Sequence, residues 1–539
     1  MRWVAFIFAM AIALAACFAQ APSPTVSGPQ GTKGKKGPEE HLGEVNFPTS
    51  CSPSVQSAMT NGLALLHSFQ YDEAEQAFAD AARRDSTCAL AYWGKAMALY
   101  EQLWEFPNAT TLAAGRQDID QARRLALKDG REYEYVQAAA AFFQDATLSP
   151  IRRVEAYSAA MDKLYRDHPD DNEAGEIYAL SLISLAQMGV QDLANRQKAI
   201  AILDPIFAKH ADNPGAAHYL IHASDTPELA PKGLEAARVY AKIAPDSAHA
   251  LHMPSHIFRR LGLWQEVIDS NVASAAAAAK ATKEHRGDAS YQFHAMDFLD
   301  YAYLQSGQEA KARQIVAELK DVPQGGESNI IEQQNEFAAR NAIELRRWEE
   351  AATLAIPQER FEWQDYTYWT RAIGAARSGD VEGAQDAVRK LSEIDQLRVT
   401  RQKAVGNVAA GESIDLSEAE AWLAYAQGKR DEAVDKLRSA ARREDARDAE
   451  PFAMPAREML ADLLLLLRRP SEALAEYRTV LKIYPNRFNA LDGAARAADA
   501  SGDRRTASDL YAKLISNCPS NADRPELQTA HKYIAANRN

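Results

Sequence analysis

The histidines of this sequence are concentrated in one short stretch. Only 12 of the 539 residues are histidine, so a stretch of about 39 residues is expected to contain about one. Residues 218–256 contain five, within the segments HYLIH and HALHMPSH. They are His218, His222, His249, His252 and His256. The spacing of four within HYLIH, repeated between the last two histidines, places both rings of each pair on one face of a helix.

Neutral imidazoles that converge from two neighbouring helices can bind a borderline metal ion. Zinc, copper and nickel all accept imidazole nitrogen as a ligand. Asp225 or Asp246 can add a carboxylate, either as an oxygen ligand or as an acceptor that orients a ring. Three nitrogen ligands with one open position would also permit metal-assisted hydrolysis. The compact metal signatures HExxH and paired CxxC do not occur in the sequence.

Two other interpretations of the histidines remain open at this level. The rings can hydrogen-bond carbonyls and hydroxyls at helix starts, pack beside aromatic residues and bind no ligand. They can also act as recognition groups in a groove that binds a peptide or a protein. The residues themselves do not decide among the three.

Other kinds of chemistry have little support, and no catalytic residue is identified. Ser224 and Ser255 lie beside the histidines, but neither sits in a G-x-S-x-G turn. Phosphate-binding glycine loops are also missing, so nucleotide binding is not expected. The chain carries 61 Lys and Arg against 74 Asp and Glu, a formal net charge of −13. Nucleic-acid binding is not expected either, because phosphate contacts require a basic face.

Internal repeats indicate which elements carry these residues. A small residue, an aromatic residue and a proline recur 34 residues apart near the C-terminus, as Ala473, Tyr477 and Pro485 and then as Ala507, Tyr511 and Pro519. Weaker copies pair a small residue with a bulky one four positions later, as in Ala74/Phe78, Ala236/Tyr240, Ala384/Val388 and Ala433/Leu437. Glycine-led turns precede several copies, at Gly307, Gly379, Gly428 and Gly502. The pattern predicts about eight to eleven antiparallel helix pairs after residue 50.

This period, with these residues at these offsets, resembles the tetratricopeptide repeat. The segments LLHSFQYDEAEQAF, AYWGKAM, AAHYLIHASDTPELA, HALHMPSHIFRRLGLW and FHAMDFLDYAYLQ resemble a group of exported bacterial proteins with this repeat and no assigned activity. The resemblance implies an all-α, right-handed superhelical solenoid of helical hairpins. It also implies that the five histidines, together with His67 and His294, face one concave groove. Pro254 must interrupt the helix of the second histidine group.

The first residues have the features of an export signal. Arg2 is followed by an apolar run, Val4 to Ala16, that is too short for a permanent membrane span. The run ends in Leu-Ala-Ala-Cys, which resembles the bacterial lipobox, so Cys17 is the expected lipid-modified N-terminus. Ordinary cleavage a few residues later, for instance after Ala19, is the alternative. Both interpretations place the protein outside the cytoplasm, in a bacterial periplasm, attached to the outer membrane or secreted.

Residues 17–48 form a predicted flexible tether, because Pro, Gly, Ser and Lys predominate and few large apolar side chains are present. Export also permits disulfides. Cys51 and Cys88 lie 37 residues apart, close to one repeat length, so both are expected near the starts of neighbouring first helices. They are the candidate disulfide partners, and Cys518 is left over.

The predicted organisation is a signal peptide at 1–16, the tether at 17–48, N-terminal and central repeats at 49–395, an irregular connection at 396–417 and C-terminal repeats at 418–535. The leading functional prediction is an exported scaffold. It binds a protein or peptide in its concave groove at the cell envelope and is held to a membrane by an N-terminal lipid. The alternative is a metal-binding protein, or a metal-dependent enzyme, that uses the histidine cluster.

Overall fold

A computed structural model describes residues 41–103, 106–145, 147–284, 289–322, 330–357, 361, 364–404, 411–446 and 453–537. These residues form helices and connecting turns, with no strand among them. The chain divides into two compact units, Met1–Ile257 and Phe258–Asn539. The expected signal peptide and Cys17 lie outside the described residues. No helix in the described ranges is both long and apolar enough to cross a bilayer.

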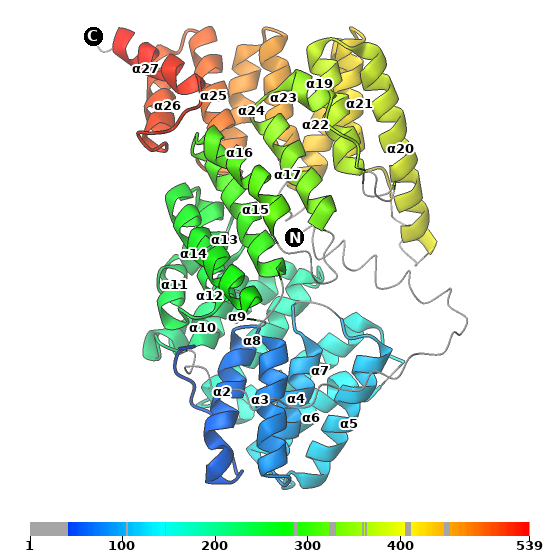
Figure 1. The fold of residues 1–539 in the computed structure, drawn as a ribbon, viewed down its shortest axis with the longest axis vertical. Coiled ribbons are helices and arrows are strands. Elements are labelled where there is room, and N and C mark those ends of the chain that lie inside the picture. The colour runs from blue at the N-terminus through cyan, green and yellow to red at the C-terminus, as the bar shows by residue number, and fades with distance from the viewer. Residues whose placement is uncertain are drawn as a thin grey trace. The chain divides into compact units, whose positions relative to one another are not determined.

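In the first unit the helices pack as antiparallel pairs in chain order (Figure 1). The pairs are α2 (Gln56–His67) with α3 (Tyr71–Arg84), α4 (Ala89–Tyr100) with α5 (Ala109–Leu125), α6 (Arg131–Phe143) with α7 (Pro150–Asp167), α8 (Asn172–Gln187) with α9 (Asp192–Lys209), and α10 (Pro214–Ser224) with α11 (Ala230–Ile243). A short helix, η1 (Pro53–Val55), precedes them, and α12 (Ala248–His252) follows. Helix α13 (Pro254–Leu261) contains the boundary between the two units.

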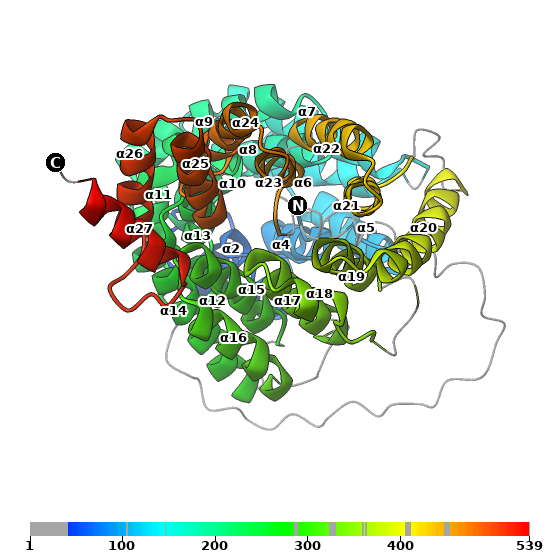
Figure 2. The same ribbon diagram turned by 90° about the horizontal axis from the view of Figure 1, so that it is seen from above.

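The second unit repeats this arrangement (Figure 2). After α14 (Trp264–Lys283), the pairs are α15 (Ser290–Gln305) with α16 (Glu309–Glu318), α17 (Ile330–Glu344) with α18 (Trp348–Ala352), α19 (Asp365–Ser378) with α20 (Val381–Ala404), α21 (Ile414–Ala426) with α22 (Arg430–Asp445), α23 (Ala456–Leu466) with α24 (Pro470–Ile483), and α25 (Phe488–Ala500) with α26 (Arg504–Ser516). A short helix, η2 (Leu319–Asp321), follows α16, and α27 (Glu526–Ala536) ends the unit. The described residues therefore contain eleven pairs, within the predicted range.

The turn inside each pair explains why the chain reverses there. Gly307 has φ of 73° and Gly502 has φ of 86°, a left-handed conformation that glycine adopts without a Cβ clash. The next backbone N–H then reaches back into the preceding helix: Gln308 N donates to Tyr303 O at 2.9 Å, and Asp503 N donates to Ala498 O at the same distance. This is the Schellman ending of a helix, which satisfies carbonyls that would otherwise lack a donor.

Small residues allow the paired helices to approach closely. Ala473 and Ala507, which carry the 34-residue period, are both fully buried. A Cβ added at Gly493 on α25 would lie 2.3 Å from the ring of Tyr477 on α24. The aromatic residue of one repeat therefore packs directly on the backbone of the next, so the period in the sequence reflects the packing of neighbouring hairpins.

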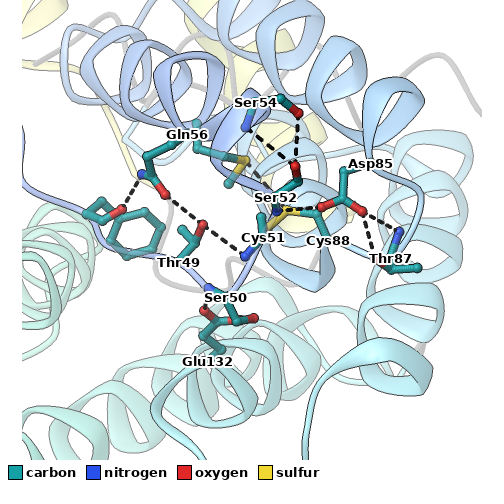
Figure 3. Close-up of a disulfide and its surroundings, with 12 residues drawn as sticks. Thr49, Ser50, Cys51, Ser52, Ser54, Gln56, Asp85, Thr87, Cys88 and Glu132 are labelled. Atoms are coloured by element: carbon teal, nitrogen blue, oxygen red, sulfur yellow. Dashed lines mark hydrogen bonds between the residues drawn. A yellow bond between two sulfur atoms is a disulfide. The ribbon is translucent and has the colours of Figure 1, made fainter.

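The structure joins Cys51 to Cys88, the pair proposed from the sequence (Figure 3). The bond ties the segment before η1 to the residue that precedes α4. Asp85 supports the same corner, accepting a hydrogen bond from Ser52 N at 2.7 Å, which lowers the pKa of its carboxyl. In the second unit, burial raises the pKa of the free Cys518 thiol to about 12.

Two predicted boundaries need correction. The tether was expected to reach residue 48, yet Leu42 and Phe47 are 3% and 1% exposed, and Glu44 N donates to Asp212 O at 3.0 Å. These two apolar side chains anchor a segment whose composition otherwise favours disorder. Residues 396–417 were expected to be irregular, but α20 extends to Ala404 and α21 begins at Ile414. Arg, Gln, Lys and Leu sustain a helix even where the apolar period stops.

Within the second unit, α14 and the turn between α15 and α16 are hydrogen-bonded to the loops before α25 and after α26. Trp264 Nε1 donates to Asn486 O at 2.9 Å, and Gly307 O accepts from Asp523 N at 3.0 Å. Arg487 is fully buried beneath these contacts, where it binds the carboxylates of Glu458 and Glu344, each at 2.8 Å.

Within the first unit, the helices that begin separate hairpins also meet. Helix α10 contacts both α8 and α2, although α2 lies about 150 residues earlier in the chain. The loop that follows α2 and the polar faces of α8 and α10 are thereby brought together in the interior of the unit. This junction contains most of the residues of chemical interest.

Candidate metal centre

Two capped helices position four of the five clustered histidines, His218 and His222 on α10 and His249 and His252 on α12. Asn213 begins α10, and its side chain accepts a hydrogen bond from Ala216 N at 3.0 Å. Ser247 begins α12 in the same way, accepting from Ala250 N at 3.2 Å. Such caps fix where each helix starts and therefore which face its side chains occupy. As predicted, Pro254 interrupts the second helix, so α12 ends at His252 and α13 begins at the proline.

The three histidines of α10 and early α12 converge through the same ring atom. His218 Nε2 lies 3.0 Å from His249 Nε2 and 3.1 Å from His222 Nε2. His218 is fully buried and His249 is 3% exposed, whereas His222 is partly exposed. Below, these three residues are called the tri-histidine cluster.

The hydrogen bond on the opposite side of His218 fixes its tautomer. Its Nδ1 lies 2.6 Å from the backbone oxygen of His67. A carbonyl can only accept, so Nδ1 carries the hydrogen and Nε2 of the neutral ring presents a lone pair. That single lone pair faces the Nε2 atoms of both neighbouring rings. It can accept one good N–H hydrogen bond but not two, whereas a metal ion placed among the three nitrogens would use all of them.

The surroundings hold these rings in the neutral form. Burial lowers the pKa of His218 to about 3. Burial also lowers the pKa of His222 and His249 well below the ordinary histidine value, and the neighbouring histidines lower both further. Neutral imidazole is the form that binds metal. At neutral pH the folded chain therefore holds three uncharged imidazoles close together, each able to act as a metal ligand.

Phe69 covers one side of the tri-histidine cluster. Its ring centroid lies 4.4 Å from that of His218, 5.3 Å from His222 and 5.5 Å from His249. The residue occupies the left-handed position after α2, with φ of 56°, where some hairpins of this chain place glycine, such as Gly307 and Gly502, and others place arginine, Arg346 and Arg468. A bulky residue in this conformation carries backbone strain. The strain is offset by the burial of an aromatic ring against the imidazoles.

A second pair of histidines lies beyond the cluster. His252 Nε2 and His256 Nε2 are 3.0 Å apart, and His256 Nδ1 lies 3.1 Å from a carboxylate oxygen of Asp225. A carboxylate behind a histidine is the usual support for a metal ligand. Asp225 therefore occupies the orienting role considered from the sequence. Asp246 does not, because it is exposed and accepts a hydrogen bond from His41 N at 2.8 Å.

The sequence predicted that His67 and His294 face the same concave groove, and the structure places them in different units. His67 is fully buried, with Nδ1 2.9 Å from Tyr219 Oη and Nε2 2.7 Å from Glu173 Oε2. The expectation that it faces an open groove is therefore wrong, because α10 packs onto α2 and α8 and fills that space. His294 belongs to α15 in the second unit, where its ring packs edge-on against Phe298.

Three residues of this region escaped the sequence analysis. Phe69 resembled an ordinary core residue, and its covering role depends on a left-handed backbone. Glu173 and Glu176 begin α8, and both are buried, at 1% and 0% exposure. Their signal was two acidic residues, three apart, at the start of an otherwise apolar helix. Acidic residues are common at helix N-termini, which hides such a signal.

No protein-family profile matches this chain, and no curated protein matches it in sequence. The chain is similar in structure to tetratricopeptide-repeat proteins. One is the tetratricopeptide repeat protein from Parabacteroides merdae ATCC 43184, which is 14% identical with a TM-score of 0.31 over 51% of this chain and 99% of that one.

Two other similar structures are parts of assemblies. Naa15/Naa10 bound to HypK-THB is 10% identical, with a TM-score of 0.25 over 89% of this chain and 91% of that one. The APC/C hetero-tetramer Cut9–Hcn1 is 11% identical, with a TM-score of 0.27 over 89% of each chain. Scores this low carry no argument about function. The all-α repeat fold rests on the helix pairs and the 34-residue period of the chain itself.

Proposed function

We propose that the first unit of this protein binds a transition-metal ion, with His218, His222 and His249 as ligands. The observation that carries the proposal is the convergence of their three Nε2 atoms, 3.0 and 3.1 Å apart, in a buried setting that keeps the rings neutral. An all-nitrogen set of this kind suits zinc, copper or nickel. At the level of the sequence this metal-binding interpretation was the alternative to the scaffold interpretation.

The spacing of the nitrogens supports a metal ligand set. Zinc–nitrogen bonds of about 2.0–2.1 Å at tetrahedral angles place two ligand nitrogens about 3.3 Å apart, so small ring rotations would suffice to accommodate the ion. The carbonyl of His67 orients His218 from behind, as a supporting acceptor does in known metal sites. Three protein ligands also leave a coordination position for water or another donor, the arrangement that metal-assisted hydrolysis requires.

The test is elemental analysis of the chain from residue 18 onward, purified without chelators. We expect close to one equivalent of zinc, copper or nickel, and its loss in His222→Ala. That substitution is chosen because His222 is partly exposed, so the fold should survive. The matched control is His210→Ala, which removes an exposed histidine close in sequence. Circular dichroism establishes that each variant remains helical.

Two results would contradict the proposal. One is a chain that remains free of metal after incubation with each of the three ions. The other is equal metal content in the wild type and in a folded His222→Ala variant. A rise in melting temperature with added metal, absent from His222→Ala, would be independent support, because a ligand that binds only the folded state stabilises it.

A second candidate function follows from the repeats. Helical-repeat folds of this type serve as protein-interaction scaffolds, because stacked hairpins present long continuous surfaces. We therefore also propose that the protein binds a protein or peptide partner at the cell envelope, to which an acylated Cys17 attaches it. Crosslinking in native membranes would identify a partner, and reconstitution with the purified partner must then give a defined stoichiometry. Failure of reconstitution would remove this candidate.

The membrane attachment is tested separately. Metabolic labelling with a radioactive fatty acid should mark the wild type and not Cys17→Ala. Ordinary signal-peptide cleavage predicts instead an unlabelled protein whose N-terminus lies after Cys17. Mass spectrometry of the purified N-terminus distinguishes the two cases.

A further inference from the structure

A second group of potential ligands lies behind the tri-histidine cluster. His67 is the last residue of α2, and Glu173 and Glu176 lie in the first two turns of α8. The side chain of His67 is 0% exposed, that of Glu173 2% and that of Glu176 0%. One ligand atom from each residue can be chosen so that all three lie within 4.8 Å of one another. The group, called the His–Glu–Glu cluster below, shares no side chain with the tri-histidine cluster.

The imidazole of His67 lies between the two carboxylates and a tyrosine. Its Nε2 is 2.7 Å from Glu173 Oε2 and 3.5 Å from Glu176 Oε2, while Nδ1 is 2.9 Å from Tyr219 Oη. If Nδ1 carries the hydrogen and donates to the tyrosine oxygen, the Nε2 lone pair of the neutral ring is directed at the carboxylates; if the hydroxyl donates to Nδ1 instead, Nε2 carries the hydrogen and donates to Glu173. A lone pair facing two acceptor groups is unfavourable unless a cation or a proton lies between them.

The carboxylate of Glu176 has no hydrogen-bond donor among the described residues. Neither of its oxygens accepts a hydrogen bond, although both are buried. Burying an ionised carboxylate without a partner costs several kcal/mol or more. One imidazolium would supply a single positive charge against the two carboxylates of this cluster. The cluster therefore requires at least one further positive charge, from a proton or from a metal ion.

The backbone of α10 lies close to these ligand atoms at Gly215. A Cβ added at Gly215 would lie 2.3 Å from Glu176 Oε2 and 2.6 Å from His67 Nδ1. Only glycine permits α10 to approach this closely, so the backbone of α10 encloses the cluster on this side. Burial and the charges of Glu173 and Asp171 raise the pKa of Glu176 well above the usual value. A bound divalent cation would reverse this effect.

We propose that His67, Glu173 and Glu176 form a second metal site, which takes a divalent cation such as Mn²⁺, Fe²⁺ or Zn²⁺. One imidazole and two carboxylates form a harder ligand set than three imidazoles, and they favour ions that accept oxygen ligands. The backbone oxygen of His67 accepts the Nδ1 hydrogen of His218, so His67 belongs to the second site by its side chain and supports the tri-histidine cluster by its carbonyl. The proposal stands whether or not the tri-histidine cluster binds metal.

The first experiment titrates Mn²⁺ into the chelator-treated chain from residue 18 onward, followed by electron paramagnetic resonance of free Mn²⁺. We expect one tight Mn²⁺ equivalent in the wild type. The isosteric variant Glu176→Gln removes one ligand charge and should weaken Mn²⁺ binding at least tenfold, as should Glu173→Gln. His222→Ala should retain this ion, which separates failure of this site from failure of the tri-histidine site. Glu228→Gln, at an exposed glutamate, is the matched control.

The second experiment needs no variant and remains decisive if the glutamines impair folding. Crystals grown with Mn²⁺ should show an anomalous difference peak within bonding distance of His67 Nε2 and both carboxylates. A peak elsewhere, or none, would overturn the proposal. Equal Mn²⁺ binding by the wild type and a folded Glu176→Gln would overturn it too. No Mn²⁺ binding together with a more stable Glu176→Gln would show that a proton, rather than a metal ion, supplies the missing charge.

Discussion

At the scale of single residues, the buried histidines make stability depend on pH. In the folded chain the pKa of His218 falls to about 3, whereas an unfolded histidine titrates near pH 6.5. Between these values the unfolded chain binds a proton that the folded chain does not, so the free energy of unfolding decreases as the pH falls. His222 and His249 act in the same direction.

We therefore expect the metal-free chain to lose about 2 kcal/mol between pH 7 and pH 5 from His218 alone. The charge of Asp225 opposes this effect at His222 and that of Arg196 reinforces it, but burial is the larger cause. Urea unfolding at pH 7, 6 and 5 measures the slope. A metal-free protein as stable at pH 5 as at pH 7 would contradict burial of neutral histidines.

Phe69 is a residue at which two physical effects oppose each other. Phe69→Gly relieves the left-handed backbone at φ of 56°, a gain of about 1–2 kcal/mol. It also removes a ring that is 2% exposed, and deleting a buried phenylalanine costs about 3–5 kcal/mol. We expect the loss to dominate, giving net destabilisation of about 2 kcal/mol and weaker metal binding. A more stable Phe69→Gly would show that the ring does not cover the cluster.

At the scale of helices, the buried Arg487 connects four elements of the second unit. It bonds Glu458 on α23, Glu344 on α17 and the hydroxyl of Tyr301 on α15 from its place just before α25. Arg487→Ala leaves two buried carboxylates without their shared cation, which typically costs about 3–5 kcal/mol. Thermal unfolding measures the loss, with the exposed Arg478→Ala as the control. Equal melting temperatures for the two variants would mean that the network contributes nothing.

The elements themselves were largely predictable. Antiparallel pairs follow from a 34-residue period, and their reversals from glycines such as Gly307 and Gly502, because both are local properties of the chain. The break at Pro254 was predictable for the same reason. The length of α20 was not, because its last residues lack an apolar face and helix propensity alone sets where it ends.

At the scale of the molecule, the disulfide should contribute to the stability of the first unit. Cys51 and Cys88 close a loop across a sequence separation of 37, which in the chain-entropy model corresponds to about 4 kcal/mol. We expect Cys51→Ser/Cys88→Ser to expose the amides of α2 and α4 to hydrogen exchange. The matched control is Cys518→Ser, which removes the free thiol of the second unit. Unchanged exchange in α2 and α4 would argue against a stabilising bond.

The sequence by itself determined the repeats, the disulfide partners and the histidines worth testing, because period, spacing and residue type are properties of the chain. Tertiary structure decided which atoms meet. His67 was placed in a groove by its register, yet it is buried because α10 packs on α2 and α8. Glu173 and Glu176 became ligand candidates only through that packing. Contacts between helices more than a hundred residues apart depend on the total rotation that successive hairpins build up. A local sequence pattern does not determine that total rotation.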